Sequence, residues 1–306
     1  MNKRTSRKRH PGKRRKQTAK SMLIRGFLQS FFIVAILLIA SVVGYQTTMK
    51  LWMVEEEQSR VVEEPEPTPV PITTPSIDEV SKNLIFCYDT ETHAIRKLIL
   101  EVFHCERKQM TYITIPTSTQ FTMSDVLYKK LITVQPSIPQ MIRLSAVTRY
   151  LDASVIYDYG ALLVEDMLGL KISYYTVMPV EVYQSIFEEQ SIPDGISAES
   201  LLTGEYEQPK DGSIVAEVFT QKYLEFLDTI ESAEELSTYM EEVYATLQSN
   251  LTLEEKMNYL ESYGKTSMRN VSFTRLAGEV NNSGFVLDQG KSWQQLQQLG
   301  AMEIKD

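Results

Sequence analysis

Apolar and polar residues follow one another from residue 82 onward in a pattern that predicts strands and then helices. The apolar run 84–87 fits a buried strand, and the segments 98–103 and 109–115 flank a charged turn and predict a β-hairpin. Helical periodicity and a β-rich stretch predict, in order, helices at 123–133, 139–150 and 157–168, a strand at 172–178 and a helix at 179–187. Gly169 follows the third of these helices, a common place for a left-handed terminating residue.

The pattern beyond residue 212 predicts two longer amphipathic helices and several late strands. The helices are expected at 213–230 and 233–248, and Ser232 with Glu235 has the spacing of a capping box. Strands are expected at 270–279 and near 285–286, followed by a short helix at 293–299. Strands interspersed with helices in this way indicate an α/β layered domain.

An uncharged stretch near the N-terminus predicts a membrane anchor. Between Arg25 and Lys50 lie 24 residues without a formal charge, mostly apolar from Phe27 to Tyr45. A membrane-spanning helix needs roughly 20 apolar residues. The alternative is a cleaved signal peptide, whose apolar region is shorter, about 7–15 residues. We therefore predict a transmembrane helix over 26–49.

Charge divides the chain at this stretch and sets its expected orientation. Residues 1–54 carry 12 Lys and Arg and no acidic residue, whereas 55–306 carry 19 Lys and Arg against 40 Asp and Glu, a net charge of −21. Basic residues before a span stay in the cytoplasm, so we expect orientation and anionic lipid, not nucleic acid, to explain the basic head. The expected organisation is a basic cytoplasmic segment at 1–25, the span at 26–49, an acidic, proline-rich linker at 50–81 and an extracytoplasmic domain at 82–306, which makes a single-pass cell-membrane protein.

Two cysteines and two histidines lie within one stretch, at Cys87, His93, His104 and Cys105. Adjacent residues on a strand point to opposite faces, so His104 and Cys105 do not favour a shared zinc ion. A Cys87–Cys105 disulfide is compatible with a location outside the cytoplasm. The alternative is that Cys87 lies in a core strand and Cys105 lies in or near the hairpin turn.

Other side chains with reactive groups have simpler interpretations. The paired carboxylates Glu165-Asp166 and Glu188-Glu189 fall on predicted helices, where a solvated face is expected before acid–base catalysis. The pairs Tyr157/Tyr159 and Tyr174/Tyr175 are expected to pack half-buried, with a ligand groove as the alternative. The sequence contains no glycine-rich phosphate loop and no H-E-x-x-H zinc motif.

Several segments together have counterparts in one family. They are the opening strand at 83–87, the hairpin ending in Tyr112-Ile113-Thr114-Ile115-Pro116, and the segments 143–146, 167–175, 226–227 and 250–252. On these segments the chain resembles the LytR–CpsA–Psr (LCP) domain of membrane-anchored bacterial envelope proteins, over most of 82–300. The resemblance implies an α/β/α fold with a central mixed sheet around an apolar pocket for a polyprenyl-pyrophosphate lipid. It also implies transfer of lipid-linked glycopolymer to peptidoglycan, with Mg²⁺ at the pyrophosphate.

The chain departs from this family where arginine and aspartate hold the pyrophosphate. Thr117 and Ser118 stand where the family has Arg-Asp, Arg96 stands where it has Asp, and Phe219 lies near a later Arg position. Arg143 keeps a basic residue where the family has Lys. Each lost charged contact is worth about 1.5–3 kcal/mol, so we expect a diverged member without catalysis. The candidate ligand-binding residues are Arg96, Thr117, Ser118, Arg143 and Arg149, and no catalytic residue and no metal ligand is assigned.

Two function classes follow from the resemblance and its departures. The first is a binding or regulatory module in cell-envelope glycopolymer assembly that holds a polyprenyl-phosphate-linked precursor, peptidoglycan or an envelope protein without catalysis. The second is an active phosphotransferase in which Arg96, Arg143 or Arg149 replaces the lost side chains, and only this alternative requires Mg²⁺. A purely structural envelope scaffold is a third, weaker interpretation.

Overall fold

The structure is a computed structural model that describes residues 79–207, 212–282 and 284–302. The predicted basic segment, the span at 26–49 and nearly all of the linker lie outside these residues. Within the described ranges, no helix has the length and apolar character needed to cross a membrane. The first strand begins at Val80, two residues before the expected start of the domain.

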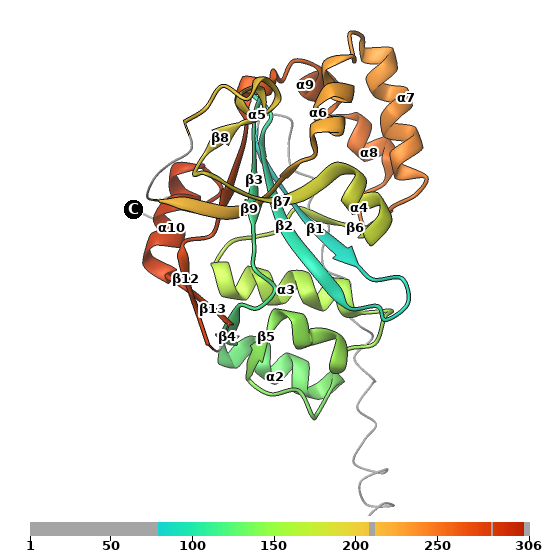
Figure 1. The fold of residues 1–306 in the computed structure, drawn as a ribbon. Helices are drawn as coiled ribbons and strands as arrows, with labels where there is room; N and C mark the ends of the chain where they lie inside the picture. The colour runs from blue at the N-terminus through green and yellow to red at the C-terminus, as the bar shows by residue number, and fades with distance from the viewer. Residues whose placement is uncertain (1–78, 208–211, 283, 303–306) are drawn as a thin grey trace, which may run out of the picture. The chain divides into compact units, whose positions relative to one another are not determined.

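A mixed seven-stranded sheet forms the centre of the described residues (Figure 1). Its strands are β1 (Val80–Tyr88), β2 (Ile95–His104), β3 (Gln109–Thr114), β6 (Tyr174–Pro179), β8 (Ile196–Ser197), β10 (Gln248–Ser249) and β11 (Val271–Arg275). They lie in the order β10-β6-β1-β2-β3-β11-β8. The pairs β1–β6 and β3–β11 are parallel, and the other neighbours are antiparallel. The predicted α/β class with a central mixed sheet is therefore confirmed.

Three small two-stranded sheets and several helices complete the fold. The sheets pair β4 (Gln120–Thr122) with β5 (Met141–Arg143), β7 (Phe187–Pro193) with β9 (Ser213–Phe219), and β12 (Gly278–Asn281) with β13 (Gly284–Leu287). The helices are α2 (Asp125–Val134), α3 (Ile156–Leu168), α4 (Val180–Ile186), α5 (Ala198–Thr203), α6 (Gln221–Asp228), α7 (Ala233–Tyr244), α8 (Leu253–Met257), α9 (Leu260–Gly264) and α10 (Gln289–Gln298). Short 3-10 helices, η1 (Leu144–Arg149) and η2 (Met268–Asn270), join them.

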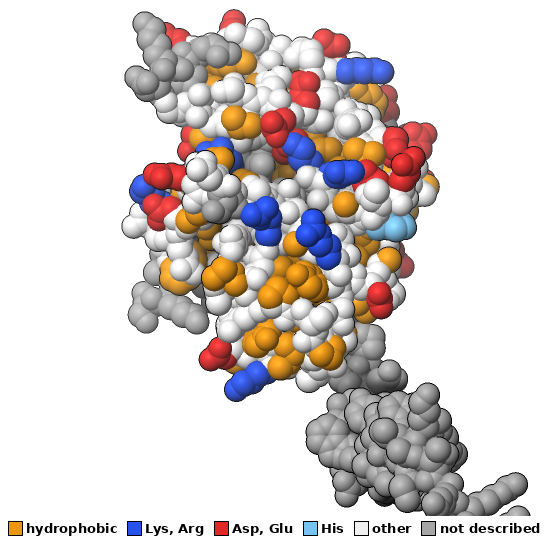
Figure 2. All heavy atoms as spheres, turned by 60° about the horizontal axis from the view of Figure 1, so that its bottom comes forward, with side chains coloured by type: hydrophobic (Ala, Val, Ile, Leu, Met, Phe, Trp, Pro, Cys, Tyr) orange, Lys and Arg blue, Asp and Glu red, His pale blue; other side chains and the backbone are white. Residues whose placement is uncertain are grey.

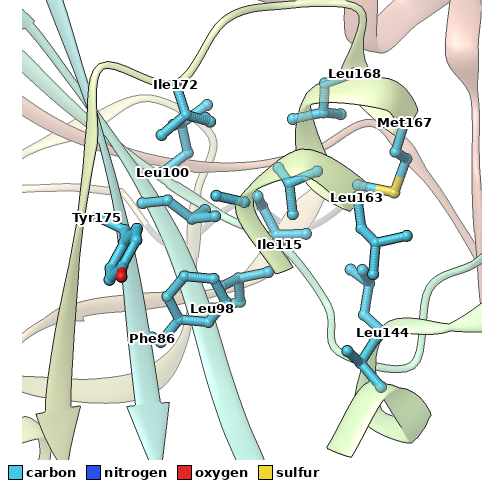
Figure 3. Close-up of a cluster of buried hydrophobic side chains, with 14 of the residues drawn as sticks. Phe86, Leu98, Leu100, Ile115, Leu144, Leu163, Met167, Leu168, Ile172 and Tyr175 are labelled. Atoms are coloured by element: carbon cyan, nitrogen blue, oxygen red, sulfur yellow. The ribbon is translucent and has the colours of Figure 1, made fainter. Parts of the chain in front are cut away.

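Apolar cores cover both faces of the central sheet, because successive strand residues point to opposite sides. On one face Leu84 and Phe86 pack with α2, α3 and α10. Figure 3 shows side chains from α3, such as Leu163 and Met167, meeting those of the strands in this core. On the other face Ile85 and the neighbouring strands pack against α4, α5, α6 and the β7–β9 pair. The sheet therefore lies between two layers.

Local signals set the limits of several elements as predicted. Gly169 ends α3 with φ of 69°, in the left-handed region that glycine tolerates best. Pro179 precedes α4. The Ser232–Glu235 capping box is present at the start of α7, with both reciprocal hydrogen bonds formed. These signals act within one turn of the chain, which is why the sequence reveals them.

Two predicted helices are wrong because strand pairing overrides local helical periodicity. The segment 213–230 contains β9 and then α6, since its β-branched first half pairs with β7 from Pro193 to Phe187. The segment 139–150 contains β5, which pairs with β4, followed by η1. Glu188-Glu189 consequently lies on a strand, not on a helix.

Burial shows that the prediction for one carboxylate is wrong and that the paired tyrosines are core residues. Glu165 is only 9% exposed, and it accepts hydrogen bonds from the Ile172 backbone N–H at 2.9 Å and from Lys171 Nζ at 3.0 Å. It therefore does not belong to a solvated face. The four paired tyrosines are buried and pack in the cores. Both cysteines are free and buried, Cys87 in β1 and Cys105 at the hairpin turn, as the core interpretation expects.

Candidate functional site

A cavity of about 470 Å³ lies between the sheet and the helices α6 to α9. Its buried lining comes from the strands and from α4, and includes Ile85, Met110, Tyr112, Met178, Ile186, Phe187 and Phe219. The lining from α6, α7 and the segments that directly follow them includes Tyr223, Leu227, Ile230, Leu236, Tyr239, Met240, Val243, Tyr244 and Leu247. Pockets for small ligands typically measure about 300–1,000 Å³. The cavity therefore has the size and mostly apolar lining of a ligand site.

Three of the helices that enclose this cavity, α6, α7 and α8, are fixed by side-chain caps at their first turns. The Thr220 side chain accepts from the Tyr223 backbone N–H at 3.2 Å at the start of α6. The capping boxes at Ser232 and Thr252 start α7 and α8. Each cap satisfies amides that the helix itself leaves unpaired. The lining side chains of α6 and α7 thereby point inward from helices with defined starts.

An ion pair interrupts the apolar lining. Glu101 of β2 and Lys256 of α8 both line the cavity and are 7% and 9% exposed. Lys256 Nζ lies 3.7 Å from Glu101 Oε1, donates to Tyr263 Oη at 2.6 Å and also donates to Tyr174 Oη. Asn83 Nδ2 donates to Glu101 Oε1 at 3.4 Å. Burial lowers the pKa of Lys256, while the Glu101 charge opposes that shift.

The exposed lining residues mark the mouth of the cavity, and they give it an acidic character. They include Glu231, Ser232, Glu261 and Lys265. Lys265 forms an ion pair with Glu261, so the cation at the mouth is already neutralised. An anionic head group would meet a net negative charge, because Glu231 and Glu261 outnumber Lys265, and it would meet no unpaired lysine or arginine among the described lining residues.

The residues expected from the sequence to bind the ligand gather elsewhere, at the start of β2 and after β3. Thr117 Oγ1 donates to the Arg96 carbonyl at 3.5 Å, and the Thr117 carbonyl accepts from the Ser145 backbone N–H at 2.8 Å. Arg143 lies on β5 opposite Gln120. The structure therefore brings Arg96, Thr117 and the segment around Arg143 together.

Ser118 and Arg149 are the remaining two candidates. A Cβ on Gly284 would lie 2.6 Å from the Ser118 carbonyl oxygen, so β13 passes directly against Ser118. Arg149 ends η1 and is exposed, with no carboxylate within 4 Å among the described residues. Figure 2 shows Lys and Arg side chains gathered near the middle of the face that includes the lower part of Figure 1, next to hydrophobic side chains.

The five candidate residues and the cavity are separate sites. None of Arg96, Thr117, Ser118, Arg143 and Arg149 lines the cavity. The cavity occupies the half of the β2–β3 hairpin near its turn, whereas Arg96 and Thr117 lie at the open end of the hairpin. Arg96 is itself bound to Asp89, with Nη2 to Oδ2 at 2.6 Å, and this hydrogen-bonded ion pair lowers the pKa of Asp89.

The described residues contain no cluster of metal-ligating side chains. Among them, no group of three or more His, Cys, Asp or Glu side chains is placed to hold a metal ion. Mg²⁺ prefers an octahedral set of oxygens supplied by carboxylates, water and phosphate. Asp89, near the basic candidates, already binds Arg96, so we derive no chemical step through a metal here.

The polar residues of the cavity were not predicted as a site. Glu101 interrupts the apolar strand 98–103, and a carboxylate at such a position is a signal in the sequence for a buried polar site. Lys256 gave no such signal, because a lysine in a short helix usually faces solvent. Phe219 lines the cavity, and its ring centroid lies 5.0 Å from that of Tyr112.

Comparisons with known proteins found similar solved structures but no match by sequence. No protein-family model and no curated protein matches the chain. The structure of TagV from B. subtilis has 11% identity and a TM-score of 0.47, and covers 74% of this chain and 99% of its own. The YwtF (TagT) structure with bound octaprenyl pyrophosphate lipid has 14% identity and a TM-score of 0.41, and covers 72% and 89%. The transcriptional regulator yvhJ from Bacillus subtilis has 12% identity and a TM-score of 0.41, and covers 74% and 99%.

Proposed function

We propose that this protein is a membrane-anchored, extracytoplasmic module that binds a polyprenyl lipid and acts in cell-envelope glycopolymer assembly or its regulation, without catalysis. The observation that carries the proposal is the mostly apolar cavity of about 470 Å³ between the sheet and α6 to α9. Burial of an apolar chain there is worth about 25 cal/mol per Å² of apolar surface removed from water. The polyprenyl chain of the precursor expected from the sequence belongs to this ligand class.

The size of the cavity limits how much of such a chain it holds. At about 30 Å³ for each water-sized group, a cavity of 470 Å³ accommodates about 16 non-hydrogen atoms. That corresponds to about three isoprene units of five carbons each. A longer carrier would therefore extend beyond the cavity.

The distribution of charge supports binding without transfer. Transfer of a phosphoryl group needs cations aimed at the developing negative charge. The described cations that line the cavity are Lys256 and Lys265, and each has a carboxylate partner within 4 Å. Phe219 supplies an aromatic ring to the lining in place of a cation.

Binding can be tested on the full chain in detergent micelles with isoprenoids of increasing length, by native mass spectrometry and thermal unfolding. We expect one isoprenoid bound per chain and a rise in unfolding temperature. Leu236→Trp, on the cavity side of α7, should abolish binding, whereas Glu234→Trp, exposed on the same helix, should not. Equal binding by both variants, or no binding by the wild type, would contradict the proposal.

The alternative, an active phosphotransferase, rests on the basic candidates outside the cavity. The full chain mixed with lipid-linked glycopolymer, Mg²⁺ and peptidoglycan would separate the two functions. We expect no covalent transfer. Transfer that disappears in Arg143→Ala would establish the alternative and overturn the non-catalytic proposal.

A further inference from the structure

The ion pair in the cavity is loosely joined, although its two members are buried. Lys256 Nζ and Glu101 Oε1 are 3.7 Å apart, beyond hydrogen-bond distance. Glu101 accepts from Asn83 at 3.4 Å and from Tyr174 at 3.5 Å, the long end of the range, and it also interacts with the Tyr112 hydroxyl. A buried carboxylate usually has shorter, charge-assisted bonds. The pair therefore retains capacity for a further polar group.

Both the lysine and a neighbouring tyrosine have unused hydrogen-bonding groups. An ammonium carries three N–H donors, and two of those on Lys256 reach Tyr174 and Tyr263. Tyr244, which also lines the cavity, has a buried hydroxyl with no hydrogen-bond partner within 3.5 Å among the described residues, although the Ser249 side chain is near enough to lower its pKa. The Glu101 charge acts on this hydroxyl and helps to raise the pKa of Tyr244, after the larger effect of burial. Donor and acceptor capacity thus converge on one wall.

We propose that Lys256 and Glu101 bind a hydroxyl group of the lipid in the cavity, so that the occupant is a neutral isoprenoid alcohol. A hydroxyl oxygen would accept the third N–H of Lys256, and its proton would be donated to the Glu101 carboxylate. Both would be charge-assisted bonds, and the one to Glu101 would be shorter than the bonds of 3.4 and 3.5 Å that this carboxylate accepts in the free cavity. This inference rests on the proposed function, because it states which chemical form of the isoprenoid the cavity takes.

Charge argues against the anionic forms of the same lipid. A phosphate or carboxylate at this wall would lie beside the Glu101 carboxylate in a buried setting, where like charges repel strongly. It would also have to pass Glu231 and Glu261 at the mouth. The one buried cation, Lys256, is already shared with Glu101 and two tyrosines.

A ligand without any polar group would also bind unfavourably in the cavity. A pure hydrocarbon would exclude water from the pair and supply no hydrogen bond in return. Leaving a buried polar group unpaired costs about 1–3 kcal/mol, and more for a charged one. The ion pair therefore discriminates on both sides, against charge and against plain hydrocarbon.

The test compares three ligands that share a chain of three isoprene units: farnesol, farnesyl phosphate and the hydrocarbon farnesene. The full chain in detergent micelles is titrated with each, and binding is measured by native mass spectrometry. We expect farnesol to bind at least about tenfold more tightly than the other two. A factor of ten corresponds to about 1.4 kcal/mol, close to the low end for a hydrogen bond to a charged group.

Variants assign this preference to the buried pair. Glu101→Gln with Lys256→Met should abolish the preference for farnesol, so that farnesene binds at least as tightly. The matched double variant Glu261→Gln with Lys265→Met changes the exposed pair at the mouth and should leave the preference intact. If the first double variant does not fold, Tyr244→Phe provides the second test and should weaken farnesol binding more than farnesene binding.

Each outcome bears on a different level of the proposal. Equal binding of farnesol and farnesene, or tighter binding of farnesyl phosphate, would overturn the hydroxyl inference and leave the proposed lipid-binding function standing. Binding of none of the three ligands would overturn both. A preference for farnesol that survives in the buried double variant would show that Lys256 and Glu101 are not the residues responsible.

Discussion

Removing one member of the buried pair should destabilise the fold far more than removing both. In Lys256→Met, Glu101 stays 7% exposed and loses its cation. Breaking a buried ion pair from one side costs about 3–5 kcal/mol, because a buried charge is left uncompensated. Asn83 and Tyr174 still reach Glu101, so we expect the free energy of unfolding to fall by about 3 kcal/mol, toward the lower end of that range.

The double variant Glu101→Gln with Lys256→Met removes both charges and should be close to neutral. Replacing a buried pair with hydrophobic residues of similar volume is often neutral or stabilising by about 1–4 kcal/mol, and the Gln amide, which can still accept from Asn83 and Tyr174, keeps this variant near the neutral end. The control is Lys265→Met. Lys265 pairs with Glu261, and the two side chains are 60% and 81% exposed. An exposed pair contributes about 0–1 kcal/mol, so this change should be barely measurable.

Urea unfolding, followed by circular dichroism, gives the free energy of unfolding of each variant. For Glu101→Gln alone, stability should rise with pH. Burial lowers the pKa of Lys256 in the folded state below that of the unfolded chain, and Glu101 no longer opposes the shift. Between these two pKa values the unfolded chain binds more protons, so the free energy of unfolding increases with pH.

The reasoning would be refuted if Lys256→Met were as stable as the wild type, or if the double variant lost as much as the two single variants together. The first result would mean that Glu101 is well solvated in the folded protein. The second would mean that the two residues act independently, since coupled residues in contact deviate from additivity by about 0.5–3 kcal/mol.

Three further predictions concern other parts of the described structure. Arg96→Ala should raise the pKa of Asp89 toward its ordinary value near 3.8, measured by NMR titration. Because the folded pKa lies below the unfolded one, the stabilisation from this pair is present at neutral pH and is lost as pH falls below that value; an unchanged Asp89 pKa in the variant would contradict the pairing. Burial raises the pKa of Cys87 to about 12, so native protein at pH 8 should not react with a thiol reagent, whereas denatured, unreduced protein should show two reactive thiols, Cys87 and Cys105; no thiols after denaturation would reveal a disulfide. Ser232→Ala should cost about 0.5–2 kcal/mol through loss of the α7 cap, and hydrogen exchange should quicken at that end of the helix; uniform exchange across the chain would argue against a local capping effect.

The candidate site shows where prediction from the sequence succeeded and where it failed. The β2–β3 hairpin and the end of α3 at Gly169 follow from residues close together in the chain. The strand β9 was missed, because its β-branched residues acquire a partner only when β7 lies beside them. Glu165 was assigned to a solvated face, but the turn after α3 folds back and gives its carboxylate the Ile172 amide.

The sequence by itself determined the local elements: strands from β-rich apolar runs, helix starts from capping residues, and the division of charge between the basic head and the acidic body. These features depend on neighbouring residues and on composition, so no distant contact is needed to predict them. Only the tertiary structure decided that Glu101 and Lys256 face one another in a cavity, apart from Arg96 and Arg143. The reason is physical: whether a charged side chain is buried depends on which distant helix packs over its strand, and the local pattern around it does not contain that information.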